Sequence, residues 1–198
     1  MRVGVYGGTF DPVHYGHLRI AEVIRETHQL DKVLFVPNQV SPFKVGETTT
    51  PGLIRAVLLE RALEFNPAFQ VWAGELEQSG PSFTVDTLRR LKTELPGAEL
   101  YFLLGLDAAR DIPRWKEPET LLTLARFIAV TRPGTTEEET REAIPDGWEE
   151  NIDFVSLPAL DISSTELRGL ARAGRSLRYL TPHSVIDEIN VRNLYRTG

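Results

Sequence analysis

Residues 2–18 read RVGVYGGTFDPVHYGHL and hold the densest chemistry of the chain. The stretch begins with a β-branched run at residues 2–6, which predicts a strand that ends in Gly7 and Gly8. Residues 18–28 carry apolar side chains at helical spacing, so a helix is expected to open near Leu18. Adjacent glycines let the backbone approach a ligand closely, and a helix N-terminus adds free N–H groups and a positive dipole end. We therefore expect an anion to bind directly after the first strand.

Two histidines stand at this expected helix start. His14 and His17 are three residues apart, so both rings can face the same side and act as donors to an anion. A zinc site on the two rings and a purely structural turn with two capping histidines remain alternatives, although the chain has no HExxH motif to supply further ligands. The chain has no GxxxxGK[ST] motif and no GxGxxG fingerprint, which excludes a P-loop and argues against a redox dinucleotide enzyme.

Strand-like and helix-like segments alternate along the rest of the chain. Strands are expected at residues 32–36, 69–73, 100–104, 127–131 and 154–157, and helices at residues 53–65, 83–95, 118–126, 163–173 and 182–194. Such alternation predicts βαβ units, and these imply a parallel sheet with right-handed crossovers. The expected fold class is α/β, a Rossmann-like doubly wound parallel sheet, in which ligands bind beyond the carboxyl ends of the strands.

Capping signals mark two of the later helices. Thr181 followed by Pro182 is expected to be the N-cap and first residue of the last helix. Residues 133–151 are polar and acidic, and Thr136 with Glu139 can form a capping box for a short helix. We interpret this segment as a solvated helix and loop rather than as a repulsive gate.

Composition narrows the function further. The 198 residues suit one domain spanning 1–198, and the absence of cysteine excludes disulfides, thiol nucleophiles and cysteine-based metal sites. The net charge of −6 argues against a nucleic-acid partner. No apolar run approaches the ~18 residues of a membrane span, and the N-terminus lacks the features of a signal peptide. We expect a cytoplasmic protein without a membrane partner, and the sequence leaves a homo-oligomer open.

A second anion-binding pattern follows the last expected strand. Residues 162–168 read ISSTELR and place the hydroxyls of Ser163, Ser164 and Thr165 at a helix start, with Arg168 one turn further on. Hydroxyls, a helix N-terminus and an arginine together can hold a phosphate. An ordinary serine N-cap beside a surface arginine is the alternative. If the sheet is parallel, the two patterns can meet at one edge.

Taken together, these segments resemble a known family. GGTFDPVHYGH resembles the (T/S)FDPxHxGH signature of the nucleotidyltransferase superfamily, and ISSTELR resembles its second signature, ISSTxxR. Further segments are similar to bacterial nicotinate-nucleotide adenylyltransferases, namely SFTVDTL at 82–88, GLD at 105–107, Trp115, RPG at 132–134, RYLTP at 178–182 with Val185, and NLY at 193–195. Phe43 replaces the histidine of the family's PPHK segment, and Phe83 replaces a tyrosine.

The resemblance implies a reaction. Nicotinate mononucleotide and ATP would give deamido-NAD and pyrophosphate, with Mg²⁺ bound through the phosphates rather than by protein side chains. The mononucleotide's own phosphate is largely dianionic at pH 7 and would be the nucleophile, so no general base is needed. Adenylyl or cytidylyl transfer to another phosphorylated acceptor and non-catalytic ATP binding are the alternatives.

The resemblance also implies roles for individual residues. His14, His17, Lys44 and Arg168 would be catalytic and contact the phosphates. ATP would be bound by Gly7, Gly8, Thr9, Phe10, Gly105, Asp107, Ser163, Ser164 and Thr165. Thr84 and Trp115 would hold the nicotinate end, Trp115 by stacking on the pyridinium ring.

Overall fold

One parallel sheet organises the molecule. In a computed structural model, which describes residues 1–39, 49–78, 80–131, 136–157 and 160–196, six strands pair in the order β3-β2-β1-β4-β5-β6, every pair parallel. The strands are β1 (Arg2–Gly8), β2 (Lys32–Pro37), β3 (Phe69–Val71), β4 (Glu99–Gly105), β5 (Arg126–Val130) and β6 (Ile152–Val155). The α/β fold class and the parallel sheet predicted from the sequence are confirmed.

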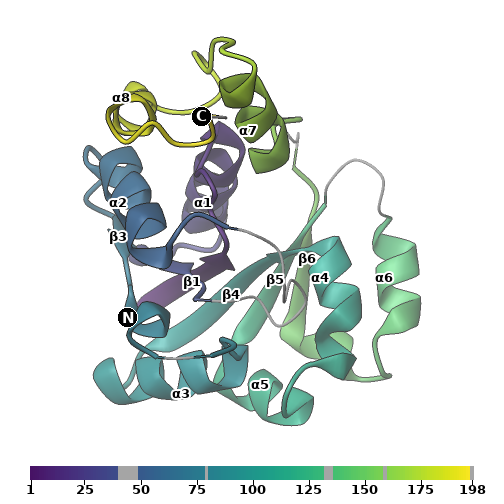
Figure 1. Cartoon of the computed structure of the whole chain (residues 1–198). Coiled ribbons are helices and arrows are strands. Elements are labelled where there is room, and N and C mark those ends of the chain that lie inside the picture. The colour runs from purple at the N-terminus through teal and green to yellow at the C-terminus, as the bar shows by residue number, and fades with distance from the viewer. Residues whose placement is uncertain (40–48, 79, 132–135, 158–159, 197–198) are drawn as a thin grey trace.

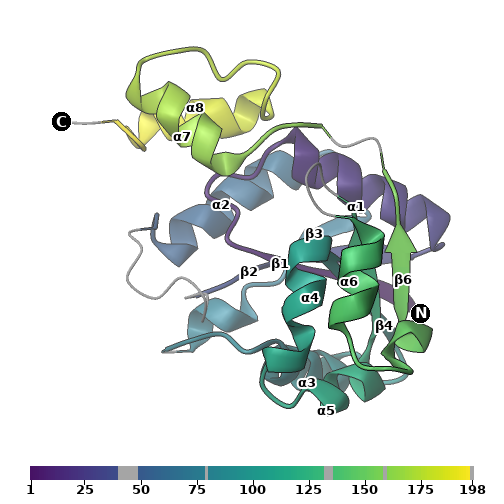
Figure 2. The same cartoon turned by 90° about the vertical axis from the view of Figure 1, so that its right-hand side faces the viewer.

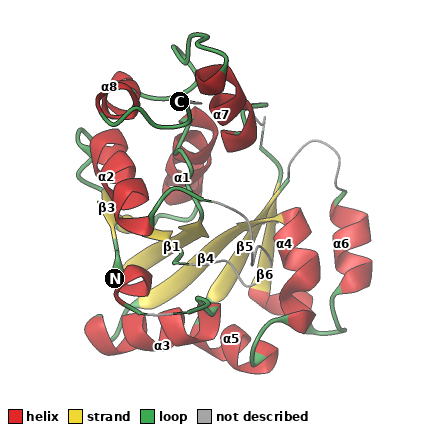
Figure 3. Cartoon of the chain, viewed as in Figure 1, coloured by secondary structure: helices red, strands yellow, loops and turns green. Residues whose placement is uncertain are grey.

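Helices cover both faces of this sheet (Figures 1 and 3). The α-helices are α1 (Tyr15–Thr27), α2 (Gly52–Leu63), α3 (Thr84–Glu94), α4 (Leu106–Asp111), α5 (Pro118–Leu124), α6 (Glu137–Ala143), α7 (Ser164–Arg172) and α8 (His183–Val191). Short 3₁₀ turns occupy η1 (Gly74–Glu77), η2 (Ile112–Arg114) and η3 (Trp148–Asn151). The doubly wound arrangement follows from the alternation of strands and helices along the chain.

Two apolar cores lie on the two sides of the sheet. Alternate residues of each strand point to opposite faces, so Val5 joins the core beneath α3, α4 and α5, while Tyr6 joins the core shared by α1, α2, α7 and α8. The four inner strands, β1, β2, β4 and β5, are buried on both faces, which explains their continuous apolar runs. The helices α7 and α8 lie beyond α1 and α2, on the side of these two helices that faces away from the sheet (Figures 1 and 2).

The strand order places the candidate site. β1 lies between β2 and β4 at the centre of the sheet, and the order reverses there. The loops after β1 and β4 therefore leave toward opposite faces and open a crevice beyond the carboxyl ends of the strands, where ligands of such folds bind. Both signatures follow strand ends, as expected.

Element boundaries differ from the sequence predictions where capping decides them. The first helix begins at Tyr15 rather than near Leu18, because His14 is its N-cap. The prediction that Thr181 caps the last helix is wrong: Pro182 takes that position, and the hydroxyl of Thr181 donates to the carbonyl of Val13 over 2.8 Å. A polar contact with another segment has replaced the local cap.

The sequence predicts one of the two short helices α4 and α6 and misses the other. The six-residue helix α4 was not predicted, because it is too short to show an apolar period. The short acidic helix does form as α6, with the hydroxyl of Thr136 accepting the N–H of Glu139.

Candidate active site

The end of β1 lies close to two aromatic rings. A Cβ atom added to Gly8 would lie 2.9 Å from the ring of Phe10, and one added to Gly7 would lie 3.1 Å from the ring of Phe102. Side chains at these positions would therefore displace the rings. Phe10 is 2% exposed, and its ring packs edge-on against that of His17 with 5.1 Å between centroids. The loop after β1 thus rests on the core and supports His17 from the core side.

The two histidine rings lie against each other at the start of α1. Their centroids are 3.7 Å apart and their planes are inclined by 31°, which confirms that both face the same side. The backbone N–H of His14 donates to Nδ1 of His17 over 3.2 Å. A neutral His17 ring therefore carries its proton on Nε2 and is a hydrogen-bond donor through that atom.

The second signature begins α7, and the hydroxyls of its two serines make hydrogen bonds within the protein. Ser163 is the N-cap, and its Oγ accepts the N–H of Glu166 over 3.1 Å. Ser164 Oγ donates to the carbonyl of Pro12 over 2.9 Å. The start of α7 is therefore attached directly to the loop after β1.

Arg168 makes the second attachment. Its Nη1 donates to the backbone carbonyl of Asp11 over 2.8 Å, and its Nη2 donates to Oγ1 of Thr165 over 3.3 Å. The guanidinium thus lies between the two signatures, one turn from the N-terminus of α7, as its position in ISSTELR predicted.

The two signatures enclose one cavity of about 340 Å³. Ten of the predicted site residues line it, namely Gly7, Gly8, Thr9, Phe10, His14, His17, Ser163, Ser164, Thr165 and Arg168. We call it the histidine cavity. It joins imidazoles, an arginine and a helix N-terminus, which is a donor-rich surface suited to phosphate oxygens.

A second cavity of about 490 Å³ lies on the other side of the loop after β1. Gly105, Asp107, Thr84 and Trp115 all line it, and we call it the tryptophan cavity. The two cavities share one wall, formed by residues 6–9. The structure therefore groups Gly105 and Asp107 with Thr84 and Trp115, rather than with the histidines.

The tryptophan cavity has features that suit a ring with a charged substituent. The indole Nε1 of Trp115 is buried and has no hydrogen-bond partner among the residues that the structure describes. Thr84 is the first residue of α3, so the free N–H end of that helix opens at this cavity. Glu75 also lines the tryptophan cavity. Burial raises the pKa of its carboxyl group, and its Oε1 accepts a hydrogen bond from the hydroxyl of Thr87 over 2.6 Å.

Sequence reasoning missed Arg55, which holds the loops around the site together. This arginine is 1% exposed, and burial lowers its pKa. Its guanidinium donates to the carbonyls of Thr9, Asn38 and Thr50 over 2.7, 2.6 and 2.8 Å. The available signal was its place on the apolar stripe of the second helix, in line with Leu58 and Leu59.

Some predictions fall outside the described residues. Lys44, together with the substitution at Phe43, belongs to residues 40–48, and the family-like segment at 132–134 is likewise not described. The proposed contact of Lys44 with phosphate therefore stays a prediction.

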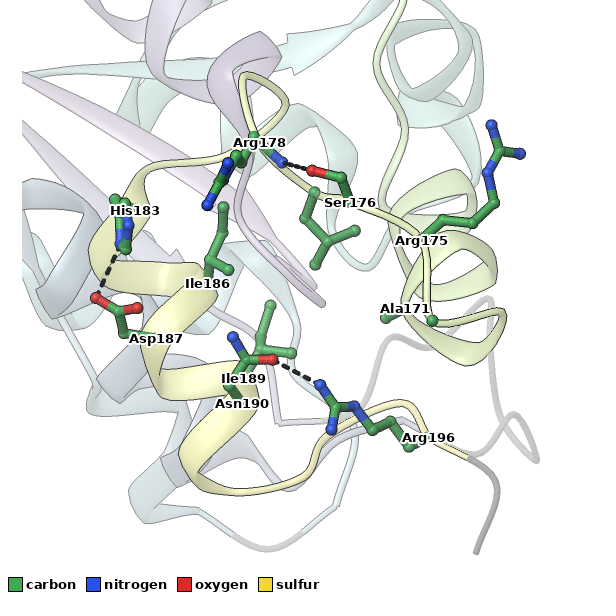
Figure 4. Close-up of a pocket in the computed structure, with 12 residues that line it drawn as sticks. Ala171, Arg175, Ser176, Arg178, His183, Ile186, Asp187, Ile189, Asn190 and Arg196 are labelled. Atoms are coloured by element: carbon green, nitrogen blue, oxygen red, sulfur yellow. Dashed lines mark hydrogen bonds and ion pairs between the residues drawn. The ribbon is translucent and has the colours of Figure 1, made fainter.

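A third hollow, of about 550 Å³, lies between α7 and α8 (Figure 4). Arginines and polar side chains line it, among them Arg178 and Arg196, and Arg196 donates to the side-chain oxygen of Asn190 over 2.8 Å. None of the predicted site residues that the structure describes borders this hollow. We place the active site at the first two cavities, because they lie beyond the strand ends.

Within the described part of the chain, no group of three or more His, Asp or Glu side chains could hold a metal ion. The zinc alternative for His14 and His17 therefore lacks a third ligand there. None of the described helices is both long and apolar enough to cross a membrane.

Comparisons with known proteins point to one family. Residues 5–170 match the family model described as cytidylyltransferase-like. A protein of Desulfitobacterium hafniense (strain Y51), named probable nicotinate-nucleotide adenylyltransferase, is 42% identical over 98% of this chain and 96% of its own. A protein of the same name from Roseiflexus sp. (strain RS-1) is 42% identical over 98% of both chains.

Solved structures show the same fold. The nicotinic acid mononucleotide adenylyltransferase of Plasmodium falciparum, complexed with NaAD, superposes with a TM-score of 0.78 at 24% identity, covering 98% of this chain and 97% of its own. A putative nicotinate-nucleotide adenylyltransferase of Vibrio parahaemolyticus gives a TM-score of 0.66 at 18% identity, over 100% and 96% of the two chains.

Proposed function

Since the chain belongs to the cytidylyltransferase-like family, and within it to the nicotinate-nucleotide adenylyltransferases, we propose that it transfers the adenylyl group of ATP to nicotinate mononucleotide. The products are deamido-NAD and pyrophosphate, and the reaction is a step of NAD biosynthesis. One observation carries the proposal: the two signatures enclose a donor-rich cavity that shares a wall with an aromatic cavity. Two anionic substrates can therefore meet across residues 6–9.

The proposed reaction is a direct displacement at the α-phosphorus. An oxygen of the mononucleotide phosphate forms a bond to that phosphorus, while the bond from it to the bridging oxygen of pyrophosphate breaks. The nucleophile is largely dianionic at pH 7, so the protein supplies neither a general base nor a covalent intermediate. What remains for the chain is to align the two anions and to stabilise the charge that develops.

The histidine cavity supplies the donors for this task. Nε2 of His17 carries a proton when its Nδ1 accepts the backbone N–H of His14. In the proposal, this N–H and the ring of His14 contact oxygens of the triphosphate. Arg168 and the start of α7, with Ser163, Ser164 and Thr165, hold the leaving phosphates. Donors fixed in this way need no reorganisation during the reaction.

The tryptophan cavity would receive the mononucleotide. The Trp115 ring offers a face for the cationic pyridinium, and the N-terminus of α3 at Thr84 favours a carboxylate over a carboxamide. Gly105 and Asp107 line the same cavity, and we keep the proposal that they border the adenosine. A preference for nicotinate over nicotinamide is thus part of the proposal.

The described side chains do not form a binding cage for Mg²⁺. The proposal has the ion arrive on the substrate phosphates, where it would neutralise their charge, and we derive no step through it. Lys44 is kept as a proposed phosphate contact, and the cytoplasm, where ATP is available, as the proposed location.

A coupled assay of pyrophosphate release tests the proposal. The purified protein is given ATP with nicotinate mononucleotide, nicotinamide mononucleotide or phosphopantetheine in parallel, and CTP replaces ATP in a matched set. Release with ATP and nicotinate mononucleotide, well above that of the other pairs, is expected. Binding of ATP without release for any acceptor would support a non-catalytic ATP-binding protein instead, and a faster reaction with another acceptor would reassign the substrate.

A further inference from the structure

The loop that carries His14 is held by the C-terminal part of the chain. Four hydrogen bonds from residues beyond 163 reach four positions of the stretch 11–15 one after another. Arg168 donates to the carbonyl of Asp11 over 2.8 Å, and Ser164 donates to that of Pro12 over 2.9 Å. Thr181 donates to the carbonyl of Val13 over 2.8 Å, and the N–H of Tyr15 donates to the carbonyl of Leu180 over 3.0 Å. The backbone that leads into the histidine pair is therefore fixed from outside.

A fifth contact is made by a residue that the proposed reaction does not use. The phenol of Tyr195, four residues beyond the end of α8, donates to Oδ1 of Asp11 over 2.6 Å. Asp11 is 3% exposed, and its second oxygen accepts the N–H of Thr50 over 3.1 Å. A carboxylate at this depth needs such donors, because its transfer from water is otherwise unfavourable. Burial and the adjacent carboxylate raise the pKa of Tyr195, so the phenol keeps its proton at neutral pH.

The position of Asp11 links Tyr195 to the residues of the histidine cavity. Asp11 lies three residues before His14, and its own carbonyl accepts the guanidinium of Arg168. A shift of Asp11 would therefore move both the imidazole side and the arginine side of the histidine cavity. Tyr195 lines neither that cavity nor the tryptophan cavity. Any effect of Tyr195 on the reaction is therefore indirect, and its hydrogen bond to Asp11 is the contact that reaches the loop after β1.

We propose that Tyr195 is a positioning residue for adenylyl transfer. By holding the buried carboxylate of Asp11, it fixes the loop that presents His14 and meets Arg168. This inference rests on the proposed function and adds to it a residue outside both cavities.

The variant Tyr195→Phe tests the inference, because it removes the hydroxyl and keeps the ring. We expect kcat to fall roughly tenfold, since small misplacements of reacting groups are costly. The KM for nicotinate mononucleotide should change less than about twofold, because the tryptophan cavity is left in place. The matched control is Tyr179→Phe, which makes the same change before α8 at a side chain that is 89% exposed. Its kinetics should equal those of the wild type.

A double-mutant cycle shows whether the effect passes through Asp11. In the background of Asp11→Ala, adding Tyr195→Phe should cost less than about twofold in kcat, since the contact is already lost. Equal losses in both backgrounds would contradict the inference, and so would a Tyr195→Phe enzyme with wild-type kcat. A rise in both KM values with unchanged kcat would also contradict it.

A measurement without turnover separates this inference from the proposed function. The chain has four histidines, and two of them, His28 and His183, lie beside Asp153 and Asp187. In Tyr195→Phe, the imidazole NMR signals of His14 and His17 should shift while those of His28 and His183 stay in place. Unshifted signals for His14 and His17 would overturn the positioning role whatever the substrate proves to be. Failure of the wild type to use nicotinate mononucleotide, with these shifts present, would instead overturn only the proposed function.

Discussion

Arg168 and Asp11 are 157 residues apart in the chain, yet the guanidinium of Arg168 donates a 2.8 Å hydrogen bond to the carbonyl of Asp11. This contact joins the last signature to the first across the carboxyl ends of the sheet. It places the arginine on the same cavity as the histidine pair. The chain's own hydrogen bonds therefore help to hold the donors of the histidine cavity in place.

Loss of the His17 ring should stop the reaction without unfolding the protein. We expect His17→Ala to lose at least about a hundredfold in kcat, the scale seen when one donor to a transition state is removed. Its thermal unfolding should stay close to that of the wild type, because His17 lies at the cavity and not in a core. A folded variant with near-normal turnover would remove His17 from the mechanism.

Arg168→Lys keeps the charge but loses the fork of donors. A lysine cannot bond Asp11 and a phosphate together with fixed geometry, so kcat/KM for ATP should fall roughly tenfold or more. Arg172→Lys, one turn further along α7 at an exposed position, is the matched control. Equal kinetics for the two variants would argue against a phosphate contact by Arg168.

Trp115→Ala should affect the two substrates unequally. Loss of the ring face is expected to raise the KM for nicotinate mononucleotide roughly tenfold, and the KM for ATP much less. Trp115→Phe retains a ring but lacks Nε1, and an intermediate KM would reveal a bond from that buried donor to the ligand. An equal rise in both KM values would count against stacking.

Arg55→Met should destabilise the fold. Three carbonyl groups would lose their common donor inside the protein, and we expect the free energy of unfolding in urea to fall by about 3 kcal/mol. Arg61→Met, on the same helix with a half-exposed side chain, should cost less than about 1 kcal/mol. If the two variants unfold at the same urea concentration, the three carbonyls do not depend on Arg55.

The buried carboxyl group of Glu75 predicts a pH dependence. Its pKa is raised in the folded state, so the folded protein binds more protons than the unfolded chain above pH ~4.5. The stability that this group contributes is therefore present at low pH and is lost as pH rises through the raised pKa. Relative to the wild type, Glu75→Gln should become more stable as pH rises from 4 to 7, as measured by urea unfolding. A stability difference that is constant with pH would show that the group titrates normally.

The fold and the histidine side of the site could be predicted, because their sequence signals are local. The strand at residues 2–6, the glycines and the two histidines are neighbours in sequence, so periodicity and turn chemistry suffice. Parallel topology then explains why a segment near Ser163 meets them. The grouping of Gly105 and Asp107 with Trp115 could not be predicted, because it depends on where the loop after β1 divides the crevice.

Contacts that hold the site leave a weaker trace in the sequence. Arg55 appears as one charge on an apolar helix face, which only burial in the fold distinguishes from a surface residue. Tyr195 and Thr181 resemble tail and capping residues, and their real partners are Asp11 and Val13, far away in the chain. Their roles follow from the way the C-terminal helices return to the first strand.

Transfer of label tests the central claim most directly. The protein is incubated with nicotinate mononucleotide and ATP labelled at the α-phosphorus, and the products are separated and identified by mass. The proposed mechanism predicts that all transferred label appears in deamido-NAD, with one pyrophosphate released for each molecule formed. Label that remains in ATP, or that appears as AMP in equal amounts with and without the mononucleotide, would contradict adenylyl transfer to this acceptor.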